Sequence, residues 1–242
     1  MEDKIVVPPN WRKTPKDFLA KYQRGETKFE MEQVAAEMQL MALGDVIPLN
    51  IKINTYQYEQ EIAQFKDDWV DYLPRTDRVN NRQALSVSTY PGWDHSAVPS
   101  LPEAKIKTGN EALQETDFSY PTAVWEKCQS LHPVLNLFAP LGRTFLVRCN
   151  MGGYFYPHRD HPEFPRNVFR VLVFLKNCEK YQYDFMIDDK RLDIEEGRAY
   201  YINTRLTHRT FSFADDSTHL IMNIPMTIEN SLKVLNNLQH TH

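Results

Sequence analysis

Cysteine is scarce in this chain, and its few residues follow no metal-binding or disulfide pattern. The 242 residues include three cysteines, Cys128, Cys149 and Cys178, and no two of them form a Cys-x-x-Cys pair. A disulfide scaffold or a thiolate zinc site needs a paired or clustered set. The sequence therefore argues against both and indicates a protein of a reducing compartment.

Strong net charge and long apolar runs are also absent. The net charge of -4 gives no general attraction to a phosphate backbone. The most apolar stretch, residues 168–177, is short and contains Arg170, and residues 1–13 lack the apolar core of a signal peptide. We therefore expect a cytoplasmic protein that has neither a nucleic-acid nor a membrane partner.

The chain does contain enough apolar material for one folded domain over residues 1–242, with 42% hydrophobic and 12% aromatic residues. Residues 1–142 predict a mainly helical cover with some strands. Helices are expected at 29–45, 58–73 and 122–138, the last with a break near Pro133, and a strand at 82–90. The buried stripe of the first helix is predicted to be Met31, Val34, Ala35, Met38, Met41 and Ala42.

After Arg143 the chain consists of short segments that are rich in β-branched and aromatic residues and separated by turn residues. Strands are expected within residues 144–150, 154–160, 167–175, 181–187, 199–204, 207–213 and 219–224. So many short strands predict a jelly-roll core over residues 143–226, followed by a closing helix at 227–239. The expected fold class is α+β, a double-stranded β-helix (jelly roll) covered by N-terminal helices.

Two of these segments carry the residues of a metal site. His158 and Asp160 are two residues apart, so in an extended strand their side chains point to the same face. His208 lies on a later strand, and two imidazoles with one carboxylate form the facial triad of non-heme Fe(II) oxygenases. The alternative is a hydrogen-bonded His158–Asp160 pair in a turn and a core histidine at 208. Four other histidines are left out of the metal set: His95, His161, His240 and His242.

Arginine inside an apolar strand is the second clue. Arg170 shares a strand face with Val168 and Leu172, and a buried guanidinium requires a carboxylate partner. That partner is either an internal Asp or Glu or a dicarboxylate cosubstrate bound through the guanidinium fork. Arg148 raises the same question on its own strand.

These motifs resemble a known family. The segments GGYFYPHRDHP, NVFRVLVFLKN and RLDIEEGRAYYINTRLTHRTFSFADDSTHLIMNIP are similar to the catalytic core of the aspartyl/asparaginyl β-hydroxylase-like dioxygenases, which use Fe(II) and 2-oxoglutarate. That group includes proline cis-hydroxylases. The resemblance covers about residues 143–238 and implies a hydroxylase of an unactivated carbon, with succinate and CO2 as coproducts. The substrate it implies is a small-molecule amino acid or a peptidyl residue.

The resemblance also implies roles for single residues. His158, Asp160 and His208 would bind Fe(II) as the catalytic centre, and Arg170 falls where the family places a cosubstrate-binding arginine. The family's arginine about ten residues after the distal histidine is missing, and His219 stands beside that position. His219, Arg170 or Arg148 would then hold the distal carboxylate of 2-oxoglutarate.

Two further readings of the same residues remain open. One is a cupin-like metalloenzyme that uses the His/Asp/His site without 2-oxoglutarate, and the other is a non-catalytic jelly-roll binding protein whose histidines are structural. The substrate also stays open among peptidyl Asp or Asn, a free amino acid and another small acid. Arg159, Arg166 and Arg205, near the expected mouth, suggest an anionic group on it, and solvated surface charge explains them as well.

Overall fold

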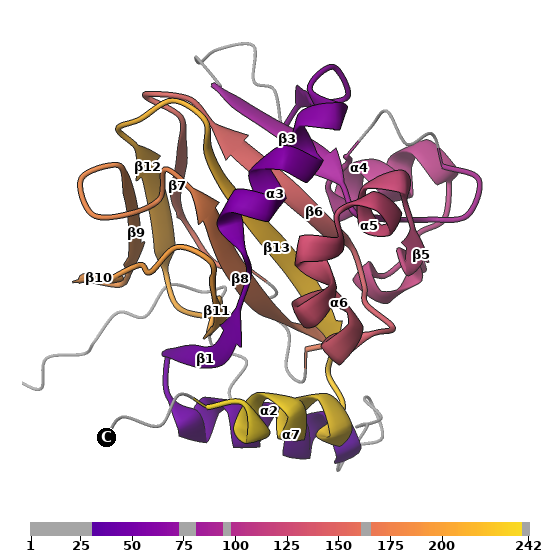
Figure 1. Ribbon diagram of the computed structural model, residues 1–242. Helices are drawn as coiled ribbons and strands as arrows, with labels where there is room; N and C mark the ends of the chain where they lie inside the picture. Colours follow the sequence, from indigo (N-terminus) through magenta and orange to yellow (C-terminus); the bar gives the residue numbers. More distant parts are fainter. Residues whose placement is uncertain (1–30, 73–80, 94–97, 161–165, 239–242) are drawn as a thin grey trace, which may run out of the picture.

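Two antiparallel β-sheets packed face to face form the centre of the structure, and helices cover the outer face of the larger sheet (Figure 1). The computed structural model describes residues 31–72, 81–93, 98–160 and 166–238. The strand order is β1-β11-β8-β13-β6-β3-β2 in the larger sheet and β10-β9-β12-β7 in the smaller one. This mixture of helix and antiparallel sheet agrees with the expected α+β class.

All seven segments predicted as strands after Arg143 contain a strand. The strands of the larger sheet are β1 (Val46–Lys52), β2 (Val70–Asp71), β3 (Arg82–Ser86), β6 (Thr144–Cys149), β8 (Val168–Lys176), β11 (Arg198–Ile202) and β13 (Ser217–Pro225). Those of the smaller sheet are β7 (Tyr154–His158), β9 (Tyr183–Ile187), β10 (Lys190–Arg191) and β12 (His208–Ser212). A separate pair consists of β4 (Ser88–Thr89) and β5 (Tyr120–Pro121).

The helices expected at 29–45, 122–138 and 227–239 are present. The helix expected at 58–73 instead covers Thr55–Ile62 and part of its expected range forms β2, and the helix at Leu101–Thr108 was not predicted. The helices are α2 (Met31–Leu43), α3 (Thr55–Ile62), α4 (Leu101–Thr108), α5 (Ala123–Lys127), α6 (His132–Phe138) and α7 (Ile228–Asn236), with short 3-10 turns η1 (Ala63–Phe65), η2 (Glu115–Asp117) and η3 (Gln129–Leu131). The third expected helix breaks at Cys128. Pro133 stands in the first turn of α6, where its missing N–H has no intrahelical partner to lose. In the described ranges no helix combines the length and apolarity that a bilayer crossing requires.

The predicted buried stripe of α2 is wrong. Met31, Met38 and Met41 are exposed, and the buried residues are Ala36, Glu37 and Leu40. Glu37 is fully buried and accepts hydrogen bonds from Arg166 Nε at 2.7 Å and from Arg205 Nη1 at 3.0 Å. The inward face of α2 therefore combines two apolar core residues, Ala36 and Leu40, with a buried ionic cluster at Glu37.

Strand alternation sorts side chains of the larger sheet between two cores. In β6, Phe145 and Val147 face the smaller sheet, whereas Leu146 packs in the core that the helices cover. β8 is buried on both faces, with Leu172 toward the smaller sheet and Val173 toward the helices. The space between the two sheets holds the candidate site.

Candidate metal centre

Strand pairing brings the two predicted histidines together. His158 ends β7 and His208 begins β12, and these antiparallel strands pair with the two histidines opposite each other. Their ring centroids are 4.2 Å apart. The register shifts between His208 and Thr210, and such irregularities are frequent beside active sites because they re-aim a side chain.

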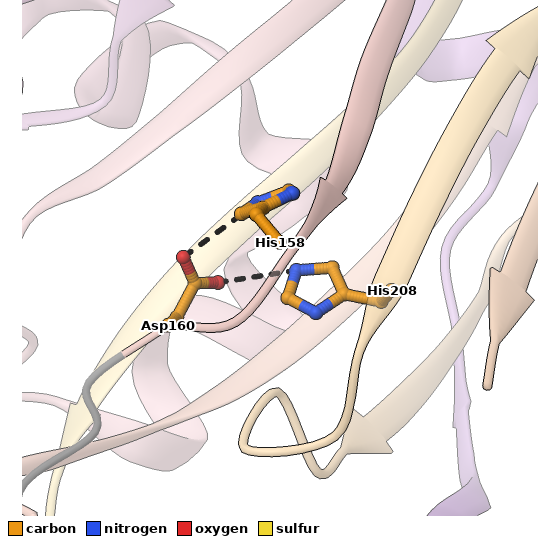
Figure 2. Close-up of side chains that lie close together, drawn as sticks. All are labelled: His158, Asp160 and His208. Atoms are coloured by element: carbon orange, nitrogen blue, oxygen red, sulfur yellow. Dashed lines mark ion pairs between the residues drawn. The ribbon is translucent and has the colours of Figure 1, made fainter. Parts of the chain in front are cut away.

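Asp160 completes the cluster just beyond the end of β7. Its backbone N–H donates to the carbonyl of Thr204 at 2.9 Å, which fixes the chain after the strand ends. Asp160 Oδ1 lies 3.7 Å from His158 Nε2, and Oδ2 lies 3.2 Å from His208 Nε2. Figure 2 shows the carboxylate facing both rings, and one ligand atom from each residue lies within 4.8 Å of the others. The three predicted ligands therefore converge on one point.

The hydrogen bonds of the rings set which nitrogen faces that point. His158 Nδ1 lies 2.7 Å from the carbonyl of Tyr156, and His208 Nδ1 lies 3.1 Å from that of Leu206. A carbonyl only accepts, so each Nδ1 carries a proton and each ring turns its Nε2 toward the centre. Two ring nitrogens and a carboxylate then face one another, and these are donor types that a metal cation can bind.

The surroundings of the centre favour an ionised Asp160 carboxylate and a neutral His158 imidazole. Burial raises the pKa of Asp160, but the Arg170 guanidinium, with His208 and His158, outweighs it and holds that pKa well below its usual range. Burial, and next the charge of His208, lowers the pKa of His158. This set of two nitrogen donors and one carboxylate fits a non-heme Fe(II) site with open positions.

Arg170 ties the centre to a buried polar network. It donates from Nη1 to Asp160 Oδ2 and from Nε to Asn223 Oδ1 at 3.1 Å. Asn223 in turn donates to Glu115 Oε2 at 3.2 Å, and Arg143 Nε donates to the same oxygen at 2.7 Å. No local sequence pattern marks Asn223, Glu115 or Arg143, because they come from three separate segments and meet only in the fold. The internal carboxylate that Arg170 requires is a candidate metal ligand.

A cavity of about 1000 Å³ opens beside the three ligands, between the two sheets and α4. Its lining includes Arg170, His219 and the apolar side chains Phe155, Phe185 and Ile221. His219 is buried, and its Nδ1 has no hydrogen-bond partner among the described residues. Burial lowers the pKa of His219 to about 3, so the ring is neutral near pH 7.

Other predicted residues lie elsewhere. Arg148 is on the helix-covered face of β6, where it donates to Gln83 Oε1 at 3.1 Å and stacks over Trp69, and it does not line the cavity. Arg166 is buried against Glu37 and is absent from the cavity wall, whereas Arg159 lines it. The positions left out of the metal set, His95, His161, His240 and His242, all lie outside the described residues.

Comparison with known proteins yields no close relative. No family model matches the chain, and no curated protein sequence matches it. Among solved structures it is similar to a prolyl hydroxylase from Trichoplax adhaerens in complex with a hypoxia inducible factor oxygen degradation domain peptide, with 10% identity, a TM-score of 0.45, and coverage of 84% of this chain and 94% of that one.

Two bacterial structures give similar values. A prolyl-4-hydroxylase from Pseudomonas putida has 10% identity and a TM-score of 0.42, with coverage of 80% of this chain and 98% of that one. An oxidoreductase of the 2OG-Fe(II) oxygenase family from Burkholderia pseudomallei has 11% identity and a TM-score of 0.41, with coverage of 84% and 96%.

Proposed function

We propose that the protein is an Fe(II)- and 2-oxoglutarate-dependent dioxygenase that hydroxylates an unactivated carbon of an amino-acid or peptidyl substrate, with succinate and CO2 as coproducts. The observation that carries the proposal is the convergence of His158 Nε2, the Asp160 carboxylate and His208 Nε2 beside a large cavity. We infer that the four central strands of the larger sheet and the smaller sheet form a jelly-roll core over residues 143–226, with residues 1–142 as cover and 227–239 as closing helix.

The protein residues would hold the metal and leave room for its partners. His158, Asp160 and His208 supply three ligands, so the remaining coordination positions are open to a keto acid and oxygen. Iron and 2-oxoglutarate, when bound, would supply the chemistry that oxidises a carbon–hydrogen bond with dioxygen as the oxidant. Arg170 keeps Asp160 ionised and oriented, and Phe185, stacked against His208 with centroids 6.0 Å apart, excludes water from that side.

His219 is proposed to contact the cosubstrate from the cavity wall. A neutral imidazole donates one N–H, and its buried Nδ1 is available to a carboxylate oxygen. Arg170 already donates a hydrogen bond to Asp160, the candidate metal ligand. Its contact with the keto acid, which the family resemblance implies, is proposed in addition to that bond. Arg148 is not part of the proposed site because it lies on the other face of β6.

The cavity size supports a substrate in addition to the cosubstrate. Pockets for small ligands measure about 300–1,000 Å³, and this one is at the upper end of that range. Arg159 on its wall is exposed and favours an anionic group on the substrate, such as the carboxylate of an amino acid or of a peptidyl acidic residue.

Turnover without a substrate tests the proposal. Iron-loaded protein in air is expected to convert 2-oxoglutarate slowly to succinate, and the rate should rise when the right amino acid or peptide is added from a panel. His208→Ala should show no succinate under the same conditions. Wild-type protein that holds iron but forms no succinate with any member of the panel would contradict the proposal.

A cupin-like metalloenzyme without 2-oxoglutarate is the second candidate. The observation that favours it is His219, a neutral group near the position where the resembling family has an arginine. This candidate predicts iron binding with no affinity for any keto acid. A binding protein without catalysis predicts no iron after either aerobic or anaerobic purification.

A further inference from the structure

The outward face of α2 is apolar and exposed. The apolar stripe expected from the sequence lies on this face, away from the core. Met31, Met38 and Met41 are 68%, 61% and 45% exposed. Val34, which lies between them in the sequence, is half-buried. These four side chains are called the α2 seam, and they occupy a face where a surface helix normally carries polar and charged residues.

No charged residue interrupts the α2 seam. The only charged residues of α2 are Glu32 and Glu37. Glu37 is buried against Arg166, and Glu32 accepts a hydrogen bond at 3.3 Å from the backbone N–H of Ile228, the first residue of α7. Both carboxylates have partners within the chain, so the outward face of α2 is left with apolar and small side chains.

The spacing of the α2 seam is that of a helix–helix contact. Its members stand at positions i, i+3, i+7 and i+10, which are successive a and d positions of a heptad. The steps of three, four and three residues read the same in both directions. A second copy of α2 that packs antiparallel about a two-fold axis therefore places Met31 against Met41 of the second copy. The same axis places Val34 against Met38, and a two-fold interface requires such self-complementarity.

Neighbouring side chains suit a second helix at this position. Ala35 and Ala42 each follow a member of the seam and are exposed, and small side chains there let a second helix approach closely. α7 lies beside α2 at one end of the molecule (Figure 1). It adds two more exposed apolar side chains, those of Ile228 and Leu232.

We propose that the α2 seam is the interface of a homodimer in which two copies of α2 pack antiparallel about a two-fold axis. This inference is independent of the proposed function and goes beyond it. A second copy fits the seam because the seam is uncharged and complementary to itself in spacing. The alternative within the chain, residues 1–30, contains seven Lys or Arg and five Asp or Glu, which match an uncharged face poorly.

The length of α2 sets the expected strength of the dimer. Its 13 residues span about 20 Å, so the contact belongs to the lower part of the size range of specific interfaces. The dimer is therefore expected to dissociate on dilution, and the fraction of dimer should rise with protein concentration.

Sedimentation velocity over a series from micromolar to millimolar protein tests the inference. Wild-type protein is expected to change from monomer to dimer along the series. Met38→Glu places a carboxylate against Val34 of the second copy, and burial of an unpaired charge should raise the dissociation constant at least about 10-fold.

Met151→Glu is the matched control. Met151 is 60% exposed, almost as Met38 is, but it stands in the turn between β6 and β7. This variant should form the wild-type dimer. Both methionines are exposed within one chain, so neither substitution should lower the free energy of unfolding. Circular dichroism checks that each variant folds, and Met31→Glu replaces Met38→Glu with the same expectation if the latter does not.

Disulfide cross-linking tests the antiparallel register. Val34→Cys and Met38→Cys proteins are mixed in equal amounts and oxidised mildly, and mass spectrometry identifies the linked pairs. The mixed pair should exceed either protein linked to itself, because position 34 faces position 38 of the second copy. The three native cysteines are buried and should not compete. An excess of self-linked pairs would contradict the antiparallel arrangement.

Each remaining outcome decides the inference. Dimer formation that is weakened by substitution in the seam and unchanged in Met151→Glu supports it. Wild-type protein that stays monomeric through the whole series overturns it, and a loss of stability in monomeric Met38→Glu would then show that the chain covers its own seam. A dimer that is unchanged in both Met38→Glu and Met31→Glu uses another surface and also overturns the inference.

Discussion

Arg170 donates a hydrogen bond to Asp160 Oδ2, the carboxylate oxygen that also lies 3.2 Å from His208 Nε2. The strand arginine and the candidate metal ligand are therefore one structural unit. The arginine offsets the cost of burying Asp160, and it fixes which edge of the carboxylate faces the two rings. Substitution of Arg170 or Asp160 should therefore weaken metal binding more than it destabilises the fold.

Loss of either histidine ligand should abolish iron binding. His158→Ala and His208→Ala each remove one nitrogen from a three-ligand set and leave the sheets in place. Metal analysis should find no bound Fe(II), and circular dichroism should match wild type. His132→Ala, whose ring contacts the carbonyl of Trp125 far from the cavity lining, should retain iron. Full iron content in either ligand variant would contradict the assignment.

Asn223 should matter through Arg170. Asn223→Leu removes the acceptor of Arg170 Nε and the donor to Glu115, and loss of such outer contacts typically lowers metal affinity about 10–100-fold. Equilibrium dialysis with Fe(II) measures this. Asn230→Leu is the control variant. It also removes a buried side-chain amide, which belongs to α7 and donates to the backbone carbonyl of Pro225. The Asn230→Leu variant should be less stable than wild type and keep its iron affinity. An equal loss of iron affinity in both variants would mean a general structural effect and contradict the role of Asn223.

The Arg143–Glu115 pair should behave as a buried ion pair. Both side chains are under 10% exposed, so Arg143→Met leaves an uncompensated carboxylate and should lower the free energy of unfolding by about 3–5 kcal/mol. Urea denaturation measures it. Glu115→Gln combined with Arg143→Met should recover most of that loss. The surface pair of Lys233 and Glu229 serves as control, and Lys233→Met should change stability by less than about 1 kcal/mol.

Acid should destabilise the fold through His219. Burial lowers its pKa from 6.5 to about 3, so between these pH values the unfolded chain binds a proton that the folded chain does not. The free energy of unfolding should therefore fall as pH drops through this window, by about 1 kcal/mol per pH unit, and be insensitive to His219 above about pH 7. His219→Gln should show a smaller slope below pH 6.5 in urea melts. Equal slopes in both proteins would show that His219 does not titrate in this way.

The cluster of candidate metal ligands was predictable because each signal is local. His158 and Asp160 follow the period-two rule of a strand, and His208 begins a segment whose pattern also predicts a strand. The edge strand β1 was missed because Pro48 breaks its pattern, although an edge strand tolerates proline. The local sequence pattern thus predicts which residues form strands, but it does not predict which strands pair with one another.

The remainder of the site depends on pairings and faces that the sequence does not encode locally. Both faces of β6 are apolar, so the sequence alone could not decide that Arg148 points to the helices. Arg82 and Glu115 reach the cavity from segments that precede the core by many residues. The exposed methionines of α2 show the same limit, because the partners of the buried Glu37, Arg166 and Arg205, come from distant segments that the helix pattern does not reveal.

Anaerobic titration of the apoprotein with Fe(II) and then 2-oxoglutarate tests the central claim most directly. The account predicts saturable iron binding followed by the visible charge-transfer band of a metal-chelated keto acid. His158→Ala, measured in parallel, should show neither. Iron binding without the band would contradict the cosubstrate and favour the cupin-like candidate, and no iron binding at all would contradict the metal centre itself.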